Sequence, residues 1–436
     1  MKVTKGGKVS ELLKDTRIPK MFRATQTFPR EVIRPEEISA AVSREMEREE
    51  IRSRIQPGMS IAITAGSRGI RNVDIITKAV VDGVKARGAN PFIVPAMGSH
   101  GGATAEGQVE MLAGYGITEE AMGCPIKSSM EVVELGYSER GRRVVLDKNA
   151  YEADGIIISC RLKPHNAFRG PYESGPCKMM TVGLGKQVGA SVVHGDGMDV
   201  IAQNIPTMAK VVLEKAKILF AIPCIENAYD ETCKIEAIPA EKILEREPEL
   251  LKYAFSNMPK LIVGEADVLV VDKVGKNFSG TGVDPNITGT FSTPYASGGL
   301  KVQRTCFLNL SKESHGNALG CGLASAITSK IFNDMDIEQM YPNCITSTVL
   351  ASARIPCVVS SDKEAMQICI KTCNKIDKDH VRMVRIPNSL HIGSIMLSEA
   401  YYEDVKAGKY PGLEAVDEPA ELEFDGDGNV VTPIVL

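Results

Sequence analysis

Short apolar runs without polar alternation recur along the first half of this chain, and longer segments with helical patterns separate them. Strands with no polar face are buried on both sides, which is typical of a parallel sheet covered by helices. Val73–Arg87 and Ala105–Gly114 are two of the predicted helices. The pattern therefore predicts an α/β fold, in which ligands bind at loops that follow the carboxyl ends of strands. The predicted strands are Met59–Thr64, Pro91–Pro95, Gly155–Cys160 and Ile218–Pro223.

A chain of 436 residues exceeds what one hydrophobic core usually holds. The charged segment Glu241–Ser256 predicts a helix that leads into a second unit near Lys260. We therefore expect two α/β domains with mainly parallel sheets, a Rossmann-like domain over residues 1–259 and a second domain over 260–436, with the active site in the cleft between them. In the second domain, strands are expected at Val268–Asp272, Pro356–Ser360, Val381–Arg385 and Ile392–Met396, and helices at Ala318–Phe332 and Lys363–Cys373.

Charge and composition exclude several classes of protein. The formal net charge is -4 with both signs mixed, so no basic footprint for nucleic acid is present. No apolar stretch reaches the roughly 18 residues of a membrane span, and Met1–Arg23 lacks a signal-peptide core. Eleven cysteines are scattered without a CxxC pair, which argues against a structural zinc site and favours reduced, buried thiols. We expect a cytoplasmic protein with no nucleic-acid or membrane partner.

Three of the six histidines lie in segments punctuated by glycine or proline that follow apolar runs. His100 lies in GSHGGAT, His165 in CRLKPHNAFRG and His194 in VVHGDGMD. Histidine can act as a general base near neutral pH or as a neutral ligand of a transition metal. Each histidine could instead cap a helix or fill a turn. Because all three are expected at strand ends, the sequence favours a shared site.

Glycine-rich segments between these histidines could bind an anion. Residues 169–190 read RGPYESGPCKMMTVGLGKQVGA, and glycines of this density allow backbone N–H groups to surround a phosphate. Lys178 and Lys186 could add positive charge or a nucleophilic amine. Arg68 and Arg71, in the turn GSRGIR, could clamp a carboxylate or remain solvated. This turn lacks the GxGxxG fingerprint of a dinucleotide site.

The order GSHGGAT, KPH, SGPCK and VVHGDG resembles the catalytic core of the nickel-pincer lactate racemase family. The resemblance implies that Lys178 carries a nickel-pincer nucleotide through a thioamide link and that His194 completes the coordination of the nickel. Gly185 and Lys186 are expected as further cofactor contacts. Enzymes of cofactor biosynthesis are then expected as partners for maturation.

The same resemblance implies an isomerase that inverts the carbinol carbon of a 2-hydroxy acid by hydride transfer, through a 2-keto acid. His100 and His165 would be the acid/base pair, one for each face of the substrate, and Arg68 would hold the substrate carboxylate. The longer loop before Lys178 favours a larger or more polar acid than lactate.

Several assignments stay open at this point. A nicotinamide-dependent 2-hydroxy acid dehydrogenase and a non-catalytic small-anion-binding protein are the alternative functions, and a homo-oligomer is an open state of assembly. His315, in NLSKESHGNALG, is expected to be a cap rather than a ligand. In the second domain, the candidates for contact with substrate or cofactor are Lys273, Lys276, Lys301 and His315.

Overall fold

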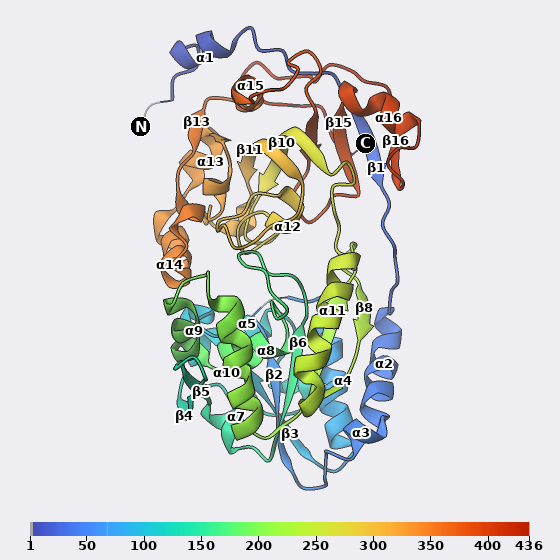
Figure 1. The fold of residues 1–436 in the computed structure, drawn as a ribbon, viewed down its shortest axis with the longest axis vertical. Helices are drawn as coiled ribbons and strands as arrows, with labels where there is room; N and C mark the ends of the chain where they lie inside the picture. Colours follow the sequence, from blue (N-terminus) through green and yellow to red (C-terminus); the bar gives the residue numbers. More distant parts are fainter. Residues whose placement is uncertain (1–2, 68, 436) are drawn as a thin grey trace. The chain divides into compact units, whose positions relative to one another are not determined.

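The computed structural model describes residues 3–67 and 69–435. It divides into two compact units, unit 2 over Pro29–Met258 and unit 1 over Met1–Phe28 together with Pro259–Leu436. Each unit contains a mostly parallel sheet with helices around it, so the predicted α/β fold class is confirmed (Figure 1).

One part of the chain lies in a different unit from the one expected. The first residues were expected in the N-terminal domain, but β1 (Met21–Gln26) belongs to the sheet of unit 1. It pairs antiparallel with β15 (Ser394–Ser398) and with β16 (Leu413–Ala415). The ladder hydrogen bonds of β1 therefore attach the beginning of the chain to its end.

The sheet of unit 2 positions the predicted site. Its strands β3 (Asn90–Pro95), β2 (Ser60–Ala65), β6 (Gly155–Arg161) and β7 (Ile218–Glu226) are neighbours in that order and run parallel. The four strands expected from the apolar runs are therefore present. The chain passes from β2 to β3 on one side and then to β6 on the other, so the strand order reverses next to β2. Ligands of open parallel sheets bind outside the carboxyl ends of strands at such a switch point.

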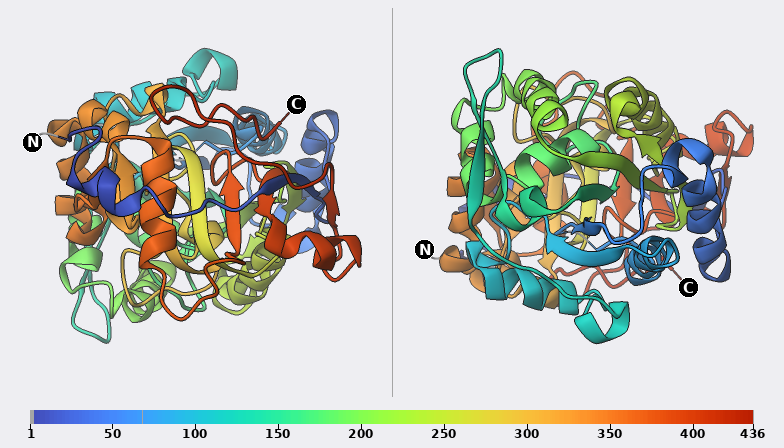
Figure 2. Two further views of the ribbon diagram at one scale, coloured as in Figure 1. Left: turned by 90° about the horizontal axis from the view of Figure 1, so that it is seen from above. Right: turned by 90° about the horizontal axis from the view of Figure 1, so that it is seen from below.

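Helices α2 and α4 bury one face of this sheet. Apolar side chains of both helices form one core cluster with side chains of β2, β3, β6 and β7, among them Ile63, Val80 and Phe220. Figure 1 shows the ribbons of α2 and α4 at the lower right of the view. The β4–β5 hairpin, Val132–Tyr137 and Arg143–Asp147, appears as the teal ribbon at the left edge of the right-hand view in Figure 2. The helices of unit 2 are α2 (Pro35–Glu47), α3 (Glu49–Arg52), α4 (Val73–Lys85), α5 (Ala105–Ala113), α6 (Glu119–Met122), α7 (Lys148–Glu152), α8 (Pro176–Lys178), α9 (Lys186–Gly195), α10 (Ile201–Lys215) and α11 (Ile243–Asn257), and β8 (Thr232–Ile235) and β9 (Ile238–Pro239) complete its sheet.

Unit 1 contains an eight-stranded sheet in the order β13-β12-β11-β10-β14-β15-β1-β16. The first five of these strands are parallel and the remaining pairs are antiparallel. Its further strands are β10 (Glu265–Val274), β11 (Lys301–Leu310), β12 (Ala326–Thr328), β13 (Cys357–Val359) and β14 (Met383–Ile386), and its helices are α1 (Lys8–Leu13), α12 (Pro285–Thr288), α13 (Ser329–Asp334), α14 (Ile337–Ser347), α15 (Asp362–Thr372) and α16 (Tyr402–Lys406).

The helix expected over Ala318–Phe332 is wrong. The segment forms a 3-10 turn at Cys321–Leu323, then strand β12, and only then helix α13. Gly320 has φ +106, a conformation that stops a helix, and the β-branched Ile327 and Thr328 are buried in the sheet. Among the helices of residues 3–67 and 69–435, none combines the length and the apolar content of a membrane span.

Candidate functional site

His100 lies in the loop that follows β3. Its Nδ1 is 2.9 Å from the carbonyl oxygen of Met97, and the ring is exposed. A carbonyl oxygen only accepts, so Nδ1 carries the hydrogen and Nε2 holds the lone pair of the neutral ring. Gly98 in the same loop has φ +58, and a Cβ there would lie 3.1 Å from the carbonyl oxygen of Val182. Glycine thus lets this loop pack closely on the segment that follows Lys178.

His165 lies in the loop that follows β6, and Glu173 organises this loop. The buried Glu173 carboxylate accepts hydrogen bonds from the backbone N–H groups of His165 at 2.6 Å and Gly170 at 3.2 Å. It also pairs with Arg169 at 3.3 Å. The backbone N–H of Ala167 donates to His165 Nδ1 at 3.1 Å, so in the neutral ring the hydrogen is on Nε2. His100 and His165 therefore present opposite tautomers: Nε2 of His100 can accept a proton, and Nε2–H of His165 can donate a hydrogen bond.

Lys178 ends a short helix rather than lying in a loop. The glycines of this segment were expected to permit a tight loop, but the segment forms α8, a π-helical turn over Met179–Gly183, and then α9. The backbone N–H of Cys177, next to Lys178, donates to the buried carboxyl of Glu247 at 2.9 Å. π-helical turns occur frequently at functional sites.

His194 also lies in a helix, so its expected place in a strand-end loop is wrong. It occupies the last turn of α9, and its Nδ1 is 2.7 Å from the carbonyl oxygen of Ala190. This hydrogen bond puts the hydrogen on Nδ1 and the lone pair on Nε2. A histidine fixed in this way by its second nitrogen is arranged as a metal ligand typically is.

The electrostatics of unit 2 bring three of the predicted residues together. Burial lowers the pKa of His165 well below its usual range, and the charges of Lys178 and His194 lower it further. Burial also lowers the pKa of His194, the bond to Ala190 opposes this, and Lys178 again adds to the lowering. In salt solution, a charge shifts the pKa of another group only over a short distance. Lys178 and His194 therefore lie close enough to His165 to shift its pKa, and we call these three residues the Lys178 site.

Arg68 lies outside the described residues, but the turn around it is anchored. The backbone N–H of Arg71 donates to Glu226 Oε1 at 2.8 Å, and Arg161 Nη2 pairs with Glu226 Oε2 at 2.6 Å. The turn after β2 is thus tied to the ends of β6 and β7. Glu173, Glu226 and Glu247 support the site without having shown any motif in the sequence.

Gly185 and Lys186 have structural surroundings that differ from a cofactor contact. A Cβ at Gly185 would lie 2.2 Å from the carbonyl oxygen of Thr181, so glycine is required by packing. The Lys186 side chain is fully buried, and its ammonium pairs with Asp147 at 3.1 Å. Lys186 therefore directs its charge into the core of unit 2.

In unit 1, the predicted lysines separate into two groups. Lys273 and Lys276 lie at the carboxyl end of β10 and in the loop beyond it, where parallel sheets bind ligands. Lys276 Nζ donates to the carbonyl oxygen of Gly280 at 2.7 Å. Lys301 lies at the opposite end, at the start of β11, and is 87% exposed. His315 is exposed and follows a short 3-10 turn with φ +48, as expected for a cap.

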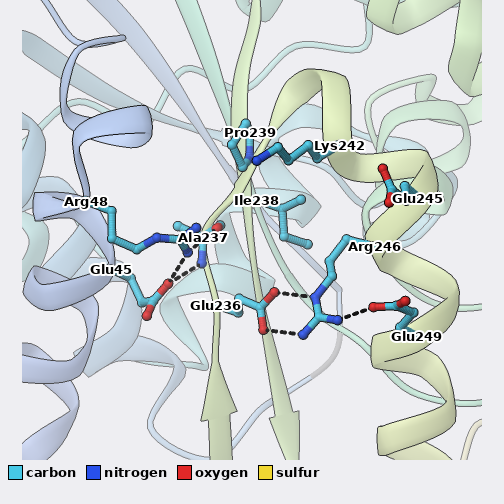
Figure 3. Close-up of a pocket in the computed structure, with 10 residues that line it drawn as sticks. All are labelled: Glu45, Arg48, Glu236, Ala237, Ile238, Pro239, Lys242, Glu245, Arg246 and Glu249. Carbon is cyan, nitrogen blue, oxygen red and sulfur yellow. Dashed lines mark hydrogen bonds and ion pairs between the residues drawn. The ribbon is translucent and has the colours of Figure 1, made fainter.

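A pocket of about 560 Å³ lies on unit 2 between α2, β9 and α11. Figure 3 shows that its cations face carboxylates: Arg246 pairs with Glu236 and Glu249, and Arg48 with Glu45. The third cation, Lys242, pairs with Glu50 at 3.0 Å. Because these charges compensate one another and no predicted site residue lines the pocket, we assign it no ligand.

The described part of the chain contains no group of three or more His, Cys, Asp and Glu side chains that could hold a metal ion. The sequence of residues 6–199 matches the family of the lactate racemase N-terminal domain. Residues 6–199, a little less than half of the 436-residue chain, are therefore similar to that domain. The family resemblance predicted from the four motifs is therefore confirmed, and the domain includes the Lys178 site.

No curated protein matches the chain significantly. Among solved structures, the chain is similar to the lactate racemase apoprotein from Thermoanaerobacterium thermosaccharolyticum, with 13% sequence identity. The match covers 81% of this chain and 91% of that one, with a TM-score of 0.48. A likeness this weak carries no functional conclusion.

Proposed function

We propose that this chain is a racemase or epimerase of 2-hydroxy acids that uses a nickel-pincer nucleotide carried by Lys178. The observation that supports the proposal is that Lys178 and His194 lie close enough to His165 to shift its pKa, within residues that match a lactate racemase N-terminal domain.

The residues present fit such a cofactor. His194 offers one imidazole nitrogen whose ring is fixed through Nδ1, and no protein cluster among the described residues supplies further ligands. A single histidine is enough where the cofactor itself brings the other donor atoms. Lys178 is half-buried one residue after Cys177, whose backbone is held by Glu247. When bound, the cofactor would supply the acceptor that takes a hydride from the substrate and returns it.

The protein residues would then handle the proton and the carboxylate. His100 Nε2 holds a lone pair and would accept the proton of the substrate hydroxyl, while His165 would direct its Nε2–H toward a substrate oxygen. Arg68 would hold the carboxylate so that only the carbonyl group can turn between its two faces. Lys178 and Lys163 add positive charge near His165, which favours an anionic substrate, while the charge of Arg169 is paired with Glu173.

The test is the intact mass and nickel content of the chain after co-expression with the cofactor-making enzymes. We expect a nucleotide-sized adduct that maps to Lys178, with nickel close to one per chain. Lys178→Arg keeps the charge and should abolish the adduct, whereas Lys163→Arg, a matched lysine near His165, should retain it. A known lactate racemase loaded in the same host serves as the positive control. An unmodified Lys178 in a host that loads this control would overturn the proposal.

A loaded protein should next be incubated with single enantiomers of 2-hydroxy acids, monocarboxylic and dicarboxylic. We expect loss of optical purity without net oxidation. Conversion that depends on added nicotinamide cofactor would indicate a dehydrogenase instead.

A further inference from the structure

The ammonium of Lys186 lies where three segments of unit 2 meet. Lys186 is the first residue of α9, the helix that ends with His194. Its Nζ pairs with Asp147 Oδ2 at 3.1 Å, at the end of the β4–β5 hairpin. Nζ also donates to the carbonyl oxygen of Pro95, the last residue of β3, and lies 3.3 Å from Gln108 Oε1. One buried cation therefore joins a helix, a hairpin and a strand end.

Gln108 extends these contacts to the loop that carries His100. Its side chain is fully buried, and its Nε2 donates to the carbonyl oxygens of Gly98 at 3.1 Å and His100 at 3.2 Å. The amide accepts from Lys186 with its oxygen and donates to the loop with its nitrogen. The polar side chains thus form a continuous path from the start of α9 to the backbone of His100.

Asp147 fixes the other side of the cation. Its Oδ1 accepts from the backbone N–H of Ala150, and its own N–H donates to the carbonyl oxygen of Leu184 at 2.7 Å. Both members of the Lys186–Asp147 pair are fully buried. A buried ion pair adds little stability compared with apolar residues of the same volume, but removal of one partner leaves the other as an unpaired buried charge. Lys186 also has φ +55, a backbone conformation that non-glycine residues adopt rarely.

We propose that Lys186 is a positioning residue that holds the His100 loop in register with the His194 helix. It touches neither histidine side chain and acts through Gln108 and Pro95. Its catalytic consequence rests on the proposed function, but the structural coupling can be measured on the protein without cofactor.

The test is hydrogen exchange, followed by mass spectrometry, of three variants of the full chain. Lys186→Met removes the charge and keeps the length, and Lys186→Met with Asp147→Asn also removes the carboxylate left without a partner. Gln108→Met breaks the path and leaves the ion pair intact. We expect exchange of residues 96–104 to rise by about tenfold in all three variants, since each loses hydrogen bonds that close this loop. Lys217→Met is the control for loss of a lysine elsewhere in unit 2, because the exposed Lys217 donates through Nζ to the carbonyl oxygen of Ala153.

Exchange of residues 96–104 that stays at the level of the wild type in Gln108→Met and in the double variant would overturn the proposal. An increase in hydrogen exchange spread evenly over unit 2 would also overturn the proposal, because a general loss of stability produces that pattern. With a loaded enzyme, we expect a lower kcat at unchanged nickel content and an unchanged KM. If no cofactor loads in the wild type, the proposed function fails while the exchange result still decides the role of Lys186.

Discussion

His194 Nδ1 lies 2.7 Å from the carbonyl oxygen of Ala190, one turn earlier in the same helix. This bond orients the ring and leaves the Nε2 lone pair for a metal. We expect His194→Ala to keep the adduct on Lys178 but to lower nickel occupancy at least about tenfold, since a direct ligand is lost. The ratio of nickel to adduct, from metal analysis and intact mass, checks this. His380→Ala, at an exposed histidine of unit 1, should leave the ratio unchanged. An unchanged ratio in His194→Ala would remove His194 from the metal site.

The opposite tautomers of His100 and His165 can be observed without cofactor. Long-range 1H–15N correlation spectra at neutral pH distinguish a protonated ring nitrogen from one with a lone pair. We expect the hydrogen on Nδ1 in His100, which faces the carbonyl of Met97, and on Nε2 in His165, which accepts from Ala167 N–H. Spectra of His100→Gln and His165→Gln assign the signals. Identical tautomers in both rings would contradict the assignment of an acceptor and a donor.

The parallel core of unit 2 could be predicted because its strands are buried on both faces and carry no polar alternation. β1 could not be predicted in the same way, because MFRATQ is short and mixed and its partners lie near the other end of the chain. β11 was missed because its first half, Lys301–Arg304, is polar or partly exposed. Both β1 and β11 form because they pair with segments distant in the sequence, and their local residue pattern does not indicate a strand.

The positions of candidate site residues could be predicted from the sequence where the residue directly follows a buried strand. His100 and His165 follow β3 and β6, as expected. The glycine-rich segment between His165 and His194 was expected to permit a tight loop with free backbone N–H groups. In the structure those glycines allow close packing: a Cβ at Gly189 would lie 2.8 Å from the carbonyl oxygen of Thr181. Tertiary contacts therefore override the local preference, and the burial of Lys186 becomes visible only with its partner Asp147.

The free energy of unfolding should fall when a single methyl group is added at Gly98. At φ +58, alanine pays about 1–2 kcal/mol for a left-handed backbone, and its Cβ would press on Val182 O at 3.1 Å, which adds about 1–3 kcal/mol. Gly58→Ala is the matched control, because Gly58 has φ +83 with no atom within 4 Å of the added Cβ. We expect Gly98→Ala to lose more free energy of unfolding, by denaturant titration, and to lose activity. Equal losses in the two variants would show that the loop relaxes around the methyl group.

Glu247 lies in α11 with its carboxyl inside the protein, where Oε2 accepts from the backbone N–H of Cys177. Only 1% of this side chain is exposed, and a Cβ at Gly175 would lie 2.5 Å from Oε1. Burial raises the pKa of Glu247 from its ordinary value of 4.5 to about 7.

This shift predicts how stability depends on pH. Between pH 4.5 and about 7, the folded protein keeps the Glu247 proton that the unfolded chain has released. The unfolded state therefore binds fewer protons, so the free energy of unfolding falls as the pH rises through this window, by about 3 kcal/mol from this group. Glu247→Gln cannot titrate and should lose this part of the slope, measured by urea titrations at a series of pH values. Glu245→Gln, an exposed glutamate of the same helix, should reproduce the wild-type profile. A Glu247→Gln profile as steep as that of the wild type would mean that the carboxyl is ionised inside the folded protein, held by the N–H of Cys177 and the start of α8.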